Sequence, residues 1–272
     1  MYDNEILILG TNGNIARALT HLFPNSTKVP RKEYISWLQH DQSKFASFLQ
    51  NLKVQPNFIF NCVGVTDSSR DYELLLKINL ELPKMLLSAL HLQQTKFVTF
   101  GTVMENIEKY SLTNNYLKSK LLYFNWLNSS NSNPNYLHCQ LHTLYGGQVV
   151  HKHMFLGQIL KALREKSKFS MSAGKQFREY HHINDDISAV IELLQGEFLG
   201  SQAVTHGNPV SLKDLADSIF DHFDCQELLE VGSFETSQFD TTKQVFFQNE
   251  GIKRTTFRES KSGIIEWLSA NL

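Results

Sequence analysis

The sequence predicts an α/β fold in which a parallel sheet is covered by helices on both faces and is accompanied by a smaller C-terminal lobe. Three observations carry this prediction. Short apolar runs alternate with amphipathic stretches in the first half of the chain, the first run leads directly into a glycine turn at Gly10, and the second half is less regular. The 272 residues are enough for one large domain with a second, smaller lobe.

Five short apolar runs have the composition of buried strands, and helical periodicity fills the stretches between them. The expected strands are Glu5–Leu9, Thr27–Val29, Asn57–Val63, Lys96–Phe100 and Tyr136–Leu144. The expected helices are Asn14–Leu22, Ser43–Leu52, Tyr72–Leu92 and Thr113–Leu127. Pro83 falls inside the third helix and is expected to end, kink or restart it, because proline lacks the N–H that a helix interior uses.

The second half mixes helical and extended segments. Helices are expected at Met154–Glu165, Asp185–Leu194, Ser211–Phe223 and Gly263–Leu272, and extended segments at Ser170–Tyr180 and Gln202–His206. We therefore assign residues 1–147 to the sheet domain, completed by residues 184–207, and residues 148–183 and 208–272 to the smaller lobe.

The composition excludes several classes of protein. Hydrophobic residues make up 42% and charged residues 19%, which is ordinary for a globular chain, and the formal net charge of −1 gives no basic surface for nucleic acid. No apolar run is long enough for a membrane span, and the N-terminus lacks the pattern of a signal peptide. The three cysteines are far apart, as expected for free thiols in a reducing compartment, so we expect a cytoplasmic protein.

A glycine-rich loop follows the first predicted strand and opens a helix. Its sequence runs from Gly10 through Asn12, Gly13, Asn14 and Ile15 to Ala16. Gly10 permits the tight turn, Gly13 lets a pyrophosphate approach the backbone, and Ala16 lets the helix pack closely on the strand. The helix N-terminus offers unpaired N–H groups and a favourable dipole to phosphates, so this loop predicts a dinucleotide site of the Rossmann type.

The residues after the second predicted strand bear on the choice of cofactor. An acidic side chain there accepts from the ribose 2′-hydroxyl of NAD, whereas a cation suits the 2′-phosphate of NADP. The run Lys28-Val29-Pro30-Arg31-Lys32 has no carboxylate, and Arg31 can clamp a phosphate through its planar guanidinium. The sequence therefore favours NADP over NAD, while a solvated basic loop is the alternative interpretation.

Tyr116 and Lys120 are spaced i and i+4 on the fourth predicted helix, so they share one face. A phenol can act as the acid or base at a carbinol or ketone oxygen, but its ordinary pKa of about 10 must fall by roughly 3 units to work near neutrality. A neighbouring ammonium in a partly dry site favours that shift, and the same lysine can hold a cofactor ribose. The spacing is common on its own; its position after the glycine loop and the strand Lys96–Phe100 makes it informative.

These residues together resemble the extended short-chain dehydrogenase/reductase family, the NAD-dependent epimerase/dehydratase group that contains enzymes modifying nucleotide sugars. The resemblance covers nearly the whole chain. In chain order the motifs are Gly10/Gly13/Ala16, Asn61-Cys62-Val63-Gly64, Asn79, Tyr116/Lys120, Leu144-Tyr145-Gly146-Gly147, and the stretch from Gly174 to Asp186. It implies a Rossmann-type doubly wound sheet with a smaller C-terminal substrate-binding lobe, and it implies NAD(P) as the cofactor. It assigns Asn61, Val63, Gly64 and Asn79 to cofactor binding beside the glycine loop, Tyr116 and Lys120.

The resemblance also implies a hydroxyl that completes the catalytic pair and an arginine that binds the substrate. Thr99 and Thr102 compete for the first role; Thr102 is favoured because it lies past the strand end, and Thr102 would then also contact the substrate. Phe100-Gly101 and Val103-Met104 contain no carboxylate, which disfavours dehydration chemistry. Arg178 matches the family's diphosphate-binding arginine and suits that role chemically.

The eleven histidines do not predict a metal site. His151 and His153 are spaced i, i+2 and His181 and His182 are adjacent, without the cysteine or carboxylate partners that metal sites require. The favoured hypothesis is a reductase acting on a keto group of a nucleotide-activated sugar, with Tyr116 as general acid. An epimerase that retains its cofactor and a non-catalytic NAD(P)-binding protein of the same fold stay open as alternatives. A small-molecule substrate is expected, and dimers are common in the family, so a homodimer is one expectation.

Overall fold

The computed structural model describes residues 2–40, 42–90, 94–107, 114–129, 135–148, 150–235 and 245–272. The chain divides into two compact units. The first comprises residues 1–141 and 190–204, and the second comprises residues 142–189 and 205–272. The two units are defined by how the chain packs. The assignment of the second lobe to substrate binding stays a prediction.

The first unit is built on a parallel sheet of six strands in the order β10-β5-β4-β3-β1-β2. The strands are β1 (Ile6–Leu9), β2 (Thr27–Val29), β3 (Phe58–Asn61), β4 (Lys96–Thr102), β5 (Tyr136–Leu141) and β10 (Gly200–Ala203). The sheet runs outward in both directions from β1 and β3, which places the carboxyl ends of all strands along one edge. This arrangement confirms the predicted Rossmann-type α/β fold.

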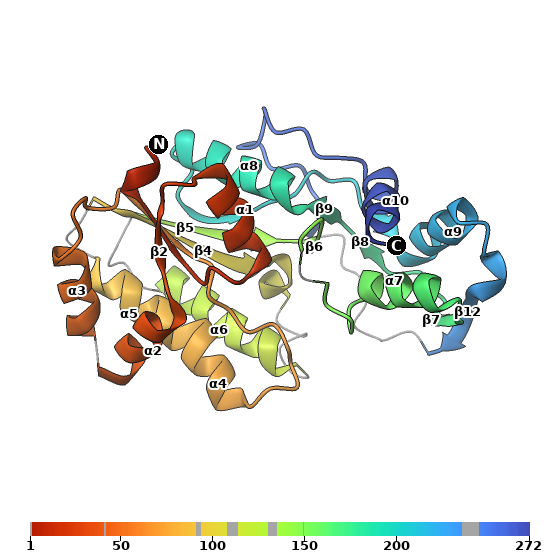
Figure 1. The fold of residues 1–272 in the computed structure, drawn as a ribbon, viewed down its shortest axis with the longest axis horizontal. Helices are drawn as coiled ribbons and strands as arrows, with labels where there is room; N and C mark the ends of the chain where they lie inside the picture. The colour runs from red at the N-terminus through yellow and green to blue at the C-terminus, as the bar shows by residue number, and fades with distance from the viewer. Residues whose placement is uncertain are drawn as a thin grey trace. The chain divides into compact units, whose positions relative to one another are not determined.

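Helices cover both faces of this sheet (Figure 1). They are α1 (Asn14–Leu22), α2 (Arg31–His40), α3 (Gln42–Gln50), α4 (Tyr72–Leu76), α5 (Leu82–Ala89) and α6 (Asn115–Ser129), with a short 3₁₀ turn η1 (Asp3–Glu5) before β1. One face packs α2, α3, α5 and α6 on a cluster that includes Leu7, Phe45, Leu86, Phe97 and Tyr123, each 2% exposed or less. Burial of these side chains provides the main stabilisation of the unit.

The structure differs from the sequence prediction in local ways. The long helix expected at Tyr72–Leu92 is divided: α4 is followed by a π-helical turn η2 (Lys77–Glu81), and α5 restarts with Pro83 in its first turn. Proline is tolerated there because the first N–H groups of a helix have no intrahelical partner. Helix α2 was not predicted, because its basic first turn resembles a loop. Leu92 and Thr113, where two predicted helices end and begin, lie outside the described residues.

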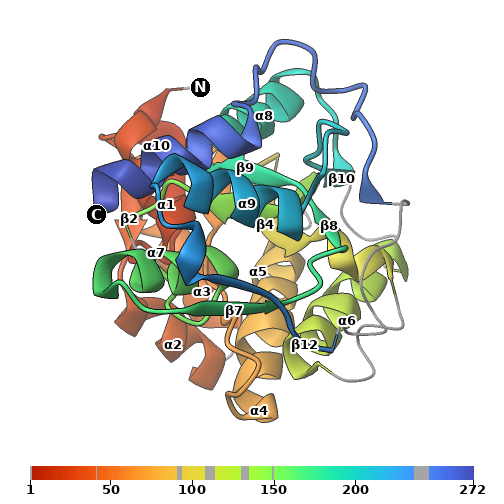
Figure 2. The same ribbon diagram turned by 90° about the vertical axis from the view of Figure 1, so that its right-hand side faces the viewer.

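The second unit has short strand pairs and a separate core. Its elements are β6 (Thr143–Tyr145), α7 (Phe155–Glu165), β7 (Phe169–Ser172), β8 (Phe177–Arg178), β9 (Tyr180–His182), β11 (Val210–Ser211), α9 (Leu212–His222), η5 (Gln226–Leu228), β12 (Leu229–Phe234) and α10 (Ser260–Asn271), with α8 (Ile183–Gln195) shared between the units. The strands pair as β11-β8, β12-β7 and β6-β9; Figure 2 shows β7 beside β12. Strand β12 was not predicted, and the segment expected at Tyr136–Leu144 is divided into β5 and β6.

The apolar faces of α7, α9 and α10 meet in this second core. Tyr145, Ile159, Leu215, Phe220 and Leu268 are among its buried members. Across the described parts of the chain, none of the helices combines the length and apolar composition that crossing a membrane requires. The three cysteines, all of them described, form no disulfide.

Candidate functional site

The glycine loop joins the carboxyl end of β1 to α1 and lies against the end of β3. Gly10 has a φ of +82°, and a Cβ on it would lie 2.7 Å from the carbonyl carbon of Cys62 and 2.8 Å from the amide nitrogen of Val63. Only glycine fits this position, because both its backbone conformation and the neighbouring backbone exclude a side chain. Gly13 is the N-cap of α1 and contributes no side-chain cap, while Ala16 is fully buried against the sheet. The loop thus has the form that a pyrophosphate site requires.

The residues after β3 are fixed by Asn79 on η2. The Asn79 side chain accepts from the amide of Val65 at 3.0 Å and donates to its carbonyl at 2.9 Å. It also donates to Ser119 Oγ on α6 at 3.0 Å. Asn79 is 2% exposed and therefore holds the loop rather than presenting free donors. Asn61 similarly accepts from the amide of Val63 at 3.2 Å.

Tyr116 and Lys120 lie in the first two turns of α6, beside the loops just described. Lys120 is buried and donates from Nζ to the carbonyl of Phe100 at 2.8 Å, which ties α6 to β4. A Cβ on Gly64 would lie 3.9 Å from Lys120 Nζ, so the ammonium also adjoins the end of β3. The structure therefore brings the predicted pair together with the predicted loops at the carboxyl edge of the sheet.

Electrostatics at this pair differ from the sequence expectation. Burial, and secondarily the Glu105 carboxylate, raises the pKa of Tyr116 above its usual value of 10.0, whereas we expected Lys120 to lower it. Burial lowers the pKa of Lys120, and Glu105 opposes that shift. Tyr116 therefore carries its proton at neutral pH in this structure, which is the form that can donate it.

The two candidate threonines have different surroundings. Thr99 is 4% exposed, and its hydroxyl lies 2.8 Å from Nδ1 of His138 in the interior of the unit. Thr102 ends β4 and is half-buried; its hydroxyl accepts from the amide of Met104 at 3.3 Å. Thr102 thus lies at the edge where the other predicted site residues meet, and Thr99 has a buried partner.

Glu105 is a residue of this site that the sequence analysis did not select. It belongs to η3 (Val103–Asn106), is 2% exposed, and accepts at Oε1 from the amide of Thr102 at 3.1 Å. Thr102 and Glu105 form a reciprocal capping box. The spacing T-x-x-E is the sequence signal that could have identified this contact.

Arg31 is exposed in the first turn of α2, two residues after β2 ends. This is the place where the ribose end of a dinucleotide is distinguished in Rossmann-type folds. Its neighbour Lys32 is also exposed, so the segment presents two cations. Whether Arg31 contacts a phosphate stays a prediction.

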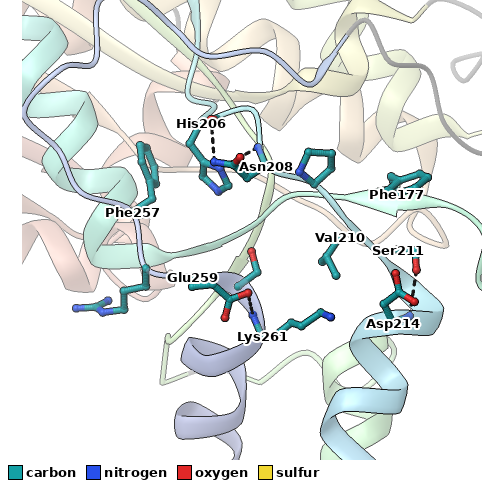
Figure 3. A pocket seen from close by; sticks show the side chains of 12 residues that line it. Phe177, His206, Asn208, Val210, Ser211, Asp214, Phe257, Glu259 and Lys261 are labelled. Carbon is teal, nitrogen blue, oxygen red and sulfur yellow. Dashed lines mark hydrogen bonds between the residues drawn. The ribbon is translucent and has the colours of Figure 1, made fainter.

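The second unit contains Arg178 and a pocket of roughly 460 Å³. Figure 3 shows the pocket between Phe177, Phe257 and the N-terminal turns of α9 and α10. Phe177 lines it, but the next residue on β8, Arg178, does not, since successive strand side chains point to opposite faces. Within the described residues, the pocket and the predicted diphosphate contact therefore belong to different faces of β8.

A buried carboxylate–histidine cluster lies elsewhere in the second unit. His181 approaches Asp186 with Nδ1 at 2.6 Å and Glu179 with Nε2 at 2.9 Å. Burial alone would lower the pKa of His181, but these carboxylates outweigh it and raise the pKa to about 9. Burial opposes ionisation of Glu179, yet hydrogen bonds and neighbouring histidines lower its pKa to about 2.

Glu179, His181 and His206 have ligand atoms within 4.8 Å of one another, a spacing that could suit a metal ion. Their hydrogen bonds argue for another role. Both nitrogens of His181 face carboxylates and so carry protons, and His206 Nδ1 accepts from the amide of Asn208 at 3.1 Å, which places its proton on Nε2. Neither ring has a lone pair left for a metal, and we interpret the cluster as structural.

Comparison with known proteins agrees with this geometry. The family model described as the NAD dependent epimerase/dehydratase family matches residues 6–202. No curated protein matches the sequence significantly.

Solved structures resemble the whole chain. A dTDP-4-dehydrorhamnose reductase from Clostridium acetobutylicum is 20% identical, with a TM-score of 0.74 over 98% of this chain and 99% of that one. The same enzyme from Bacillus anthracis, in complex with NADP, is 17% identical with a TM-score of 0.72 over 97% of each chain. A UDP-glucuronic acid 4-epimerase from Bacillus cereus, in complex with a UDP-sugar analogue and NAD, is 14% identical with a TM-score of 0.76 over 98% and 99%. At these identities the likeness shows the fold.

Proposed function

Because the chain belongs to the NAD dependent epimerase/dehydratase family, we propose that it is an NAD(P)-dependent oxidoreductase that reduces a keto group of a nucleotide-activated sugar. The observation that carries the proposal is the arrangement on α6. A proton-bearing Tyr116 and a buried Lys120 lie one turn apart, with Lys120 anchored to the strand that ends at Thr102. An acid, a cation and a hydroxyl are the groups that a ketone reduction needs at the reacting oxygen.

The first unit fits a dinucleotide. Gly10 leaves no side chain where the loop meets the end of β3, and the N-terminus of α1 has no side-chain cap to compete with a phosphate. A Cβ added to Gly13 would make only ordinary van der Waals contacts with the protein. We therefore assign Gly13 the role of leaving room for a ligand, because no clash within the protein requires glycine there. NAD(P)H bound there supplies the hydride that the protein's own side chains cannot.

The chain's residues then handle the oxygen of the substrate. Thr102 donates a hydrogen bond to the ketone oxygen and orients it. Tyr116 transfers its phenolic proton to that oxygen as the carbonyl carbon is reduced, and the resulting phenolate is stabilised by the ammonium of Lys120. Reprotonation from solvent returns Tyr116 to its starting form.

We assign the nucleotide part of the substrate to the second unit, with Arg178 as a diphosphate contact. Arg178 is half-exposed, and it donates from one guanidinium nitrogen to the carbonyl of Phe177 at 2.7 Å, which orients the side chain. A guanidinium is planar and suits a diphosphate, which it can bind through two parallel hydrogen bonds. The structurally similar proteins that act on nucleotide sugars support this choice of substrate class.

We propose NADPH as the preferred reductant because Arg31 and Lys32 are the first charged residues after β2, and the first carboxylate, Glu33, comes only after them. Arg31→Ala is expected to weaken NADPH binding roughly tenfold, about 1.4 kcal/mol, and to leave NADH binding unchanged. Lys32→Ala is the matched control and should affect both little. Tighter binding of NADH than NADPH by the unaltered protein would remove the assignment of Arg31.

The function is tested by following reduced-nicotinamide absorbance with a panel of keto-sugar nucleotides. Stoichiometric consumption of NADPH is expected for a reductase. Conversion of a nucleotide sugar without net consumption would show an epimerase instead. Dinucleotide binding with no conversion of any member of the panel would favour a non-catalytic protein.

A further inference from the structure

A fully buried serine on α6 lies between the two proposed catalytic residues in the sequence. The hydroxyl of Ser119 needs partners inside the protein, because water does not reach it. It donates to the carbonyl of Tyr116, three residues earlier, at 2.7 Å. It accepts from the side-chain amide of Asn79, 40 residues earlier, at 3.0 Å. Ser119 therefore connects the backbone at Tyr116 to a distant part of the first unit.

The partner of Ser119 is carried by the π-helical turn η2. Asn79 is the middle residue of this turn, which lies between α4 and α5. A π-helical turn inserts into a helix a residue that regular geometry would place elsewhere, and such turns occur frequently at functional sites. Asn79 also makes the two hydrogen bonds to the backbone of Val65, at 3.0 and 2.9 Å. Its side chain is therefore fixed to the loop after β3 on one side and to Ser119 on the other.

Asn79 and Ser119 together form one buried connection between the loop after β3 and the first turns of α6. The loop includes Gly64, which we assign to the dinucleotide, and α6 carries the proposed acid. A Cβ on Gly64 would lie 3.7 Å from Asn79 Oδ1 and 3.9 Å from Lys120 Nζ, so the loop adjoins both Asn79 and the ammonium. The connection thus runs from the loop that is expected to contact the cofactor to the helix that is expected to supply the proton.

Tyr116 is the second residue of α6, where a helix is weakly constrained. The first four N–H groups of a helix have no intrahelical partner, and helix ends open more readily than the middle. Ser119 adds a hydrogen bond at the Tyr116 carbonyl, in a position from which water is excluded. An error of about 1 Å in the placement of a reacting group can cost about 10²-fold in rate. The added bond therefore holds the residue whose placement the proposed reaction depends on.

We propose that Ser119 is a positioning residue of the catalytic site assigned above. Through Asn79 it sets the place of the Tyr116 hydroxyl relative to a dinucleotide bound at the loop after β3. Ser119 is fully buried, so it acts through these two residues and not by contact with a substrate. This inference rests on the proposed function and deepens it, because it names what holds the acid within reach of the ketone oxygen while the hydride reaches the adjoining carbon.

The test is Ser119→Ala, made both in the wild-type protein and in Tyr116→Phe. Alanine removes the hydroxyl and favours a helix, so we expect a folded protein. In the wild-type background kcat should fall about tenfold, because the acid is no longer held in place. The affinity for NADPH should stay near the wild-type value, because Asn79 keeps its bonds to Val65.

The Tyr116→Phe background lacks the hydroxyl that Ser119 is proposed to position. Single-turnover reduction should therefore proceed at the same residual rate with and without Ser119→Ala. A change that merely loosened the fold would lower the residual rate by the same factor as in the wild-type background. Equal factors in the two backgrounds would overturn the proposal, and so would a wild-type kcat in Ser119→Ala.

Ser129→Ala is the matched control on the same helix. Ser129 donates to the carbonyl of Trp126 at 3.0 Å with the same three-residue spacing, but it is exposed. Its loss should leave kcat and the affinity for NADPH unchanged. If Ser119→Ala does not fold, Ser119→Cys keeps the shape of the side chain with a thiol, which is a weak donor. A smaller loss of kcat is then expected in the wild-type background and none in Tyr116→Phe, and equal losses would overturn the proposal.

Tyr116→Phe alone distinguishes failure of this inference from failure of the proposed function. Wild-type turnover by Tyr116→Phe would remove the function itself. Loss of turnover in Tyr116→Phe together with a wild-type kcat in Ser119→Ala would remove only the role of Ser119.

Discussion

The buried glutamate of the first unit and the buried glutamate of the second unit are held in contrasting ways. Glu105 meets one histidine, and its other contacts are an amide at the end of β4 and the side chain of Gln140. Glu179 meets His181, whose second nitrogen faces another carboxylate, and it also accepts from the backbone amides of His206 and Gly207. The first adjoins groups suited to proton transfer, and the second joins segments of its own unit.

This contrast shows that burial of an acid–histidine pair does not by itself indicate function. In the second unit, Glu179 directly precedes β9 and accepts from the hydroxyl of Thr205 and from two backbone amides, so its carboxylate is engaged in the fold. In the first unit the same pairing lies next to a strand end that carries a hydroxyl. The neighbours of the pair, rather than the pair, decide its role.

The largest effect on stability is expected for Glu179→Ala. It leaves two backbone amides and Nε2 of the cationic His181 without their acceptor, and breaking a buried ion pair by removing one partner costs about 3–5 kcal/mol. Denaturant unfolding followed by hydrogen exchange should locate the loss in the second unit. A loss below about 1 kcal/mol would contradict the role of Glu179 as the centre of that cluster.

The next effect is on turnover, and it distinguishes Thr102 from Thr99 as the catalytic hydroxyl. Thr102→Val should lower kcat by about 10²–10³, the range for removing one hydrogen-bond donor to a reacting oxygen. Thr99→Val, of the same shape change, should leave kcat near wild type. Steady-state kinetics of the two variants decide the assignment, and the opposite order would transfer the catalytic hydroxyl to Thr99.

A smaller loss of stability is expected for Gly101→Ala. The added methyl meets Glu105 and His138 in a closely packed interior, and overpacking of this kind costs about 1–3 kcal/mol. Gly64→Ala is the control for stability, since its Cβ would have only ordinary contacts at 3.7 and 3.9 Å. Equal unfolding free energies for the two variants would show that the side chains of Glu105 and His138 can move to accommodate the added methyl group.

A pH dependence of stability is also expected in the second unit. His181 has a raised pKa of about 9, so its contribution is complete below 6.5 and is lost as the pH rises through 9. His142, whose pKa is lowered to about 4 chiefly by burial, contributes fully above 6.5 and loses that contribution as the pH falls. Glu179 loses its contribution between 4.5 and about 2. Hydrogen-exchange protection of this unit should therefore peak near pH 6.5.

The control for this pH dependence is His142→Phe, which removes the histidine whose neutral form is favoured. In this variant, hydrogen-exchange protection of the second unit should fall less steeply between pH 6.5 and 4, while the loss of protection at alkaline pH should persist. Protection that increases steadily from pH 6.5 to 9 would contradict the charge assignment of His181.

Much of the fold followed from local patterns. The strand periodicity and the loop at Gly10 predicted the parallel sheet, because buried parallel strands and tight turns have strong signatures. Helix α2 was missed, since its first turn is basic and its apolar side chains, including Trp37, show weak helical spacing. The sequence predicted that Pro83 would interrupt the helix, and the structure has a new helix starting there. The π-helical turn before Pro83 depends on tertiary packing, which the sequence pattern does not show.

The candidate site was less predictable from the sequence than the fold. Tyr116 and Lys120 are close in sequence and share a helix face, so spacing alone placed them together. Glu105 depends on His138, which is 33 residues further along the chain, and no local rule joins a capping-box glutamate to a histidine of the next strand. The raised pKa of Tyr116 has the same origin, because burial and a distant carboxylate are properties of the folded chain.

Turnover by Tyr116→Phe, measured beside its affinity for the dinucleotide, tests the central claim most directly. The variant retains the ring and loses the hydroxyl group that donates the proton. We expect kcat to fall by about 10²–10⁴ while the dinucleotide still binds. Turnover at the wild-type rate with the dinucleotide bound would contradict the claim that Tyr116 is the general acid.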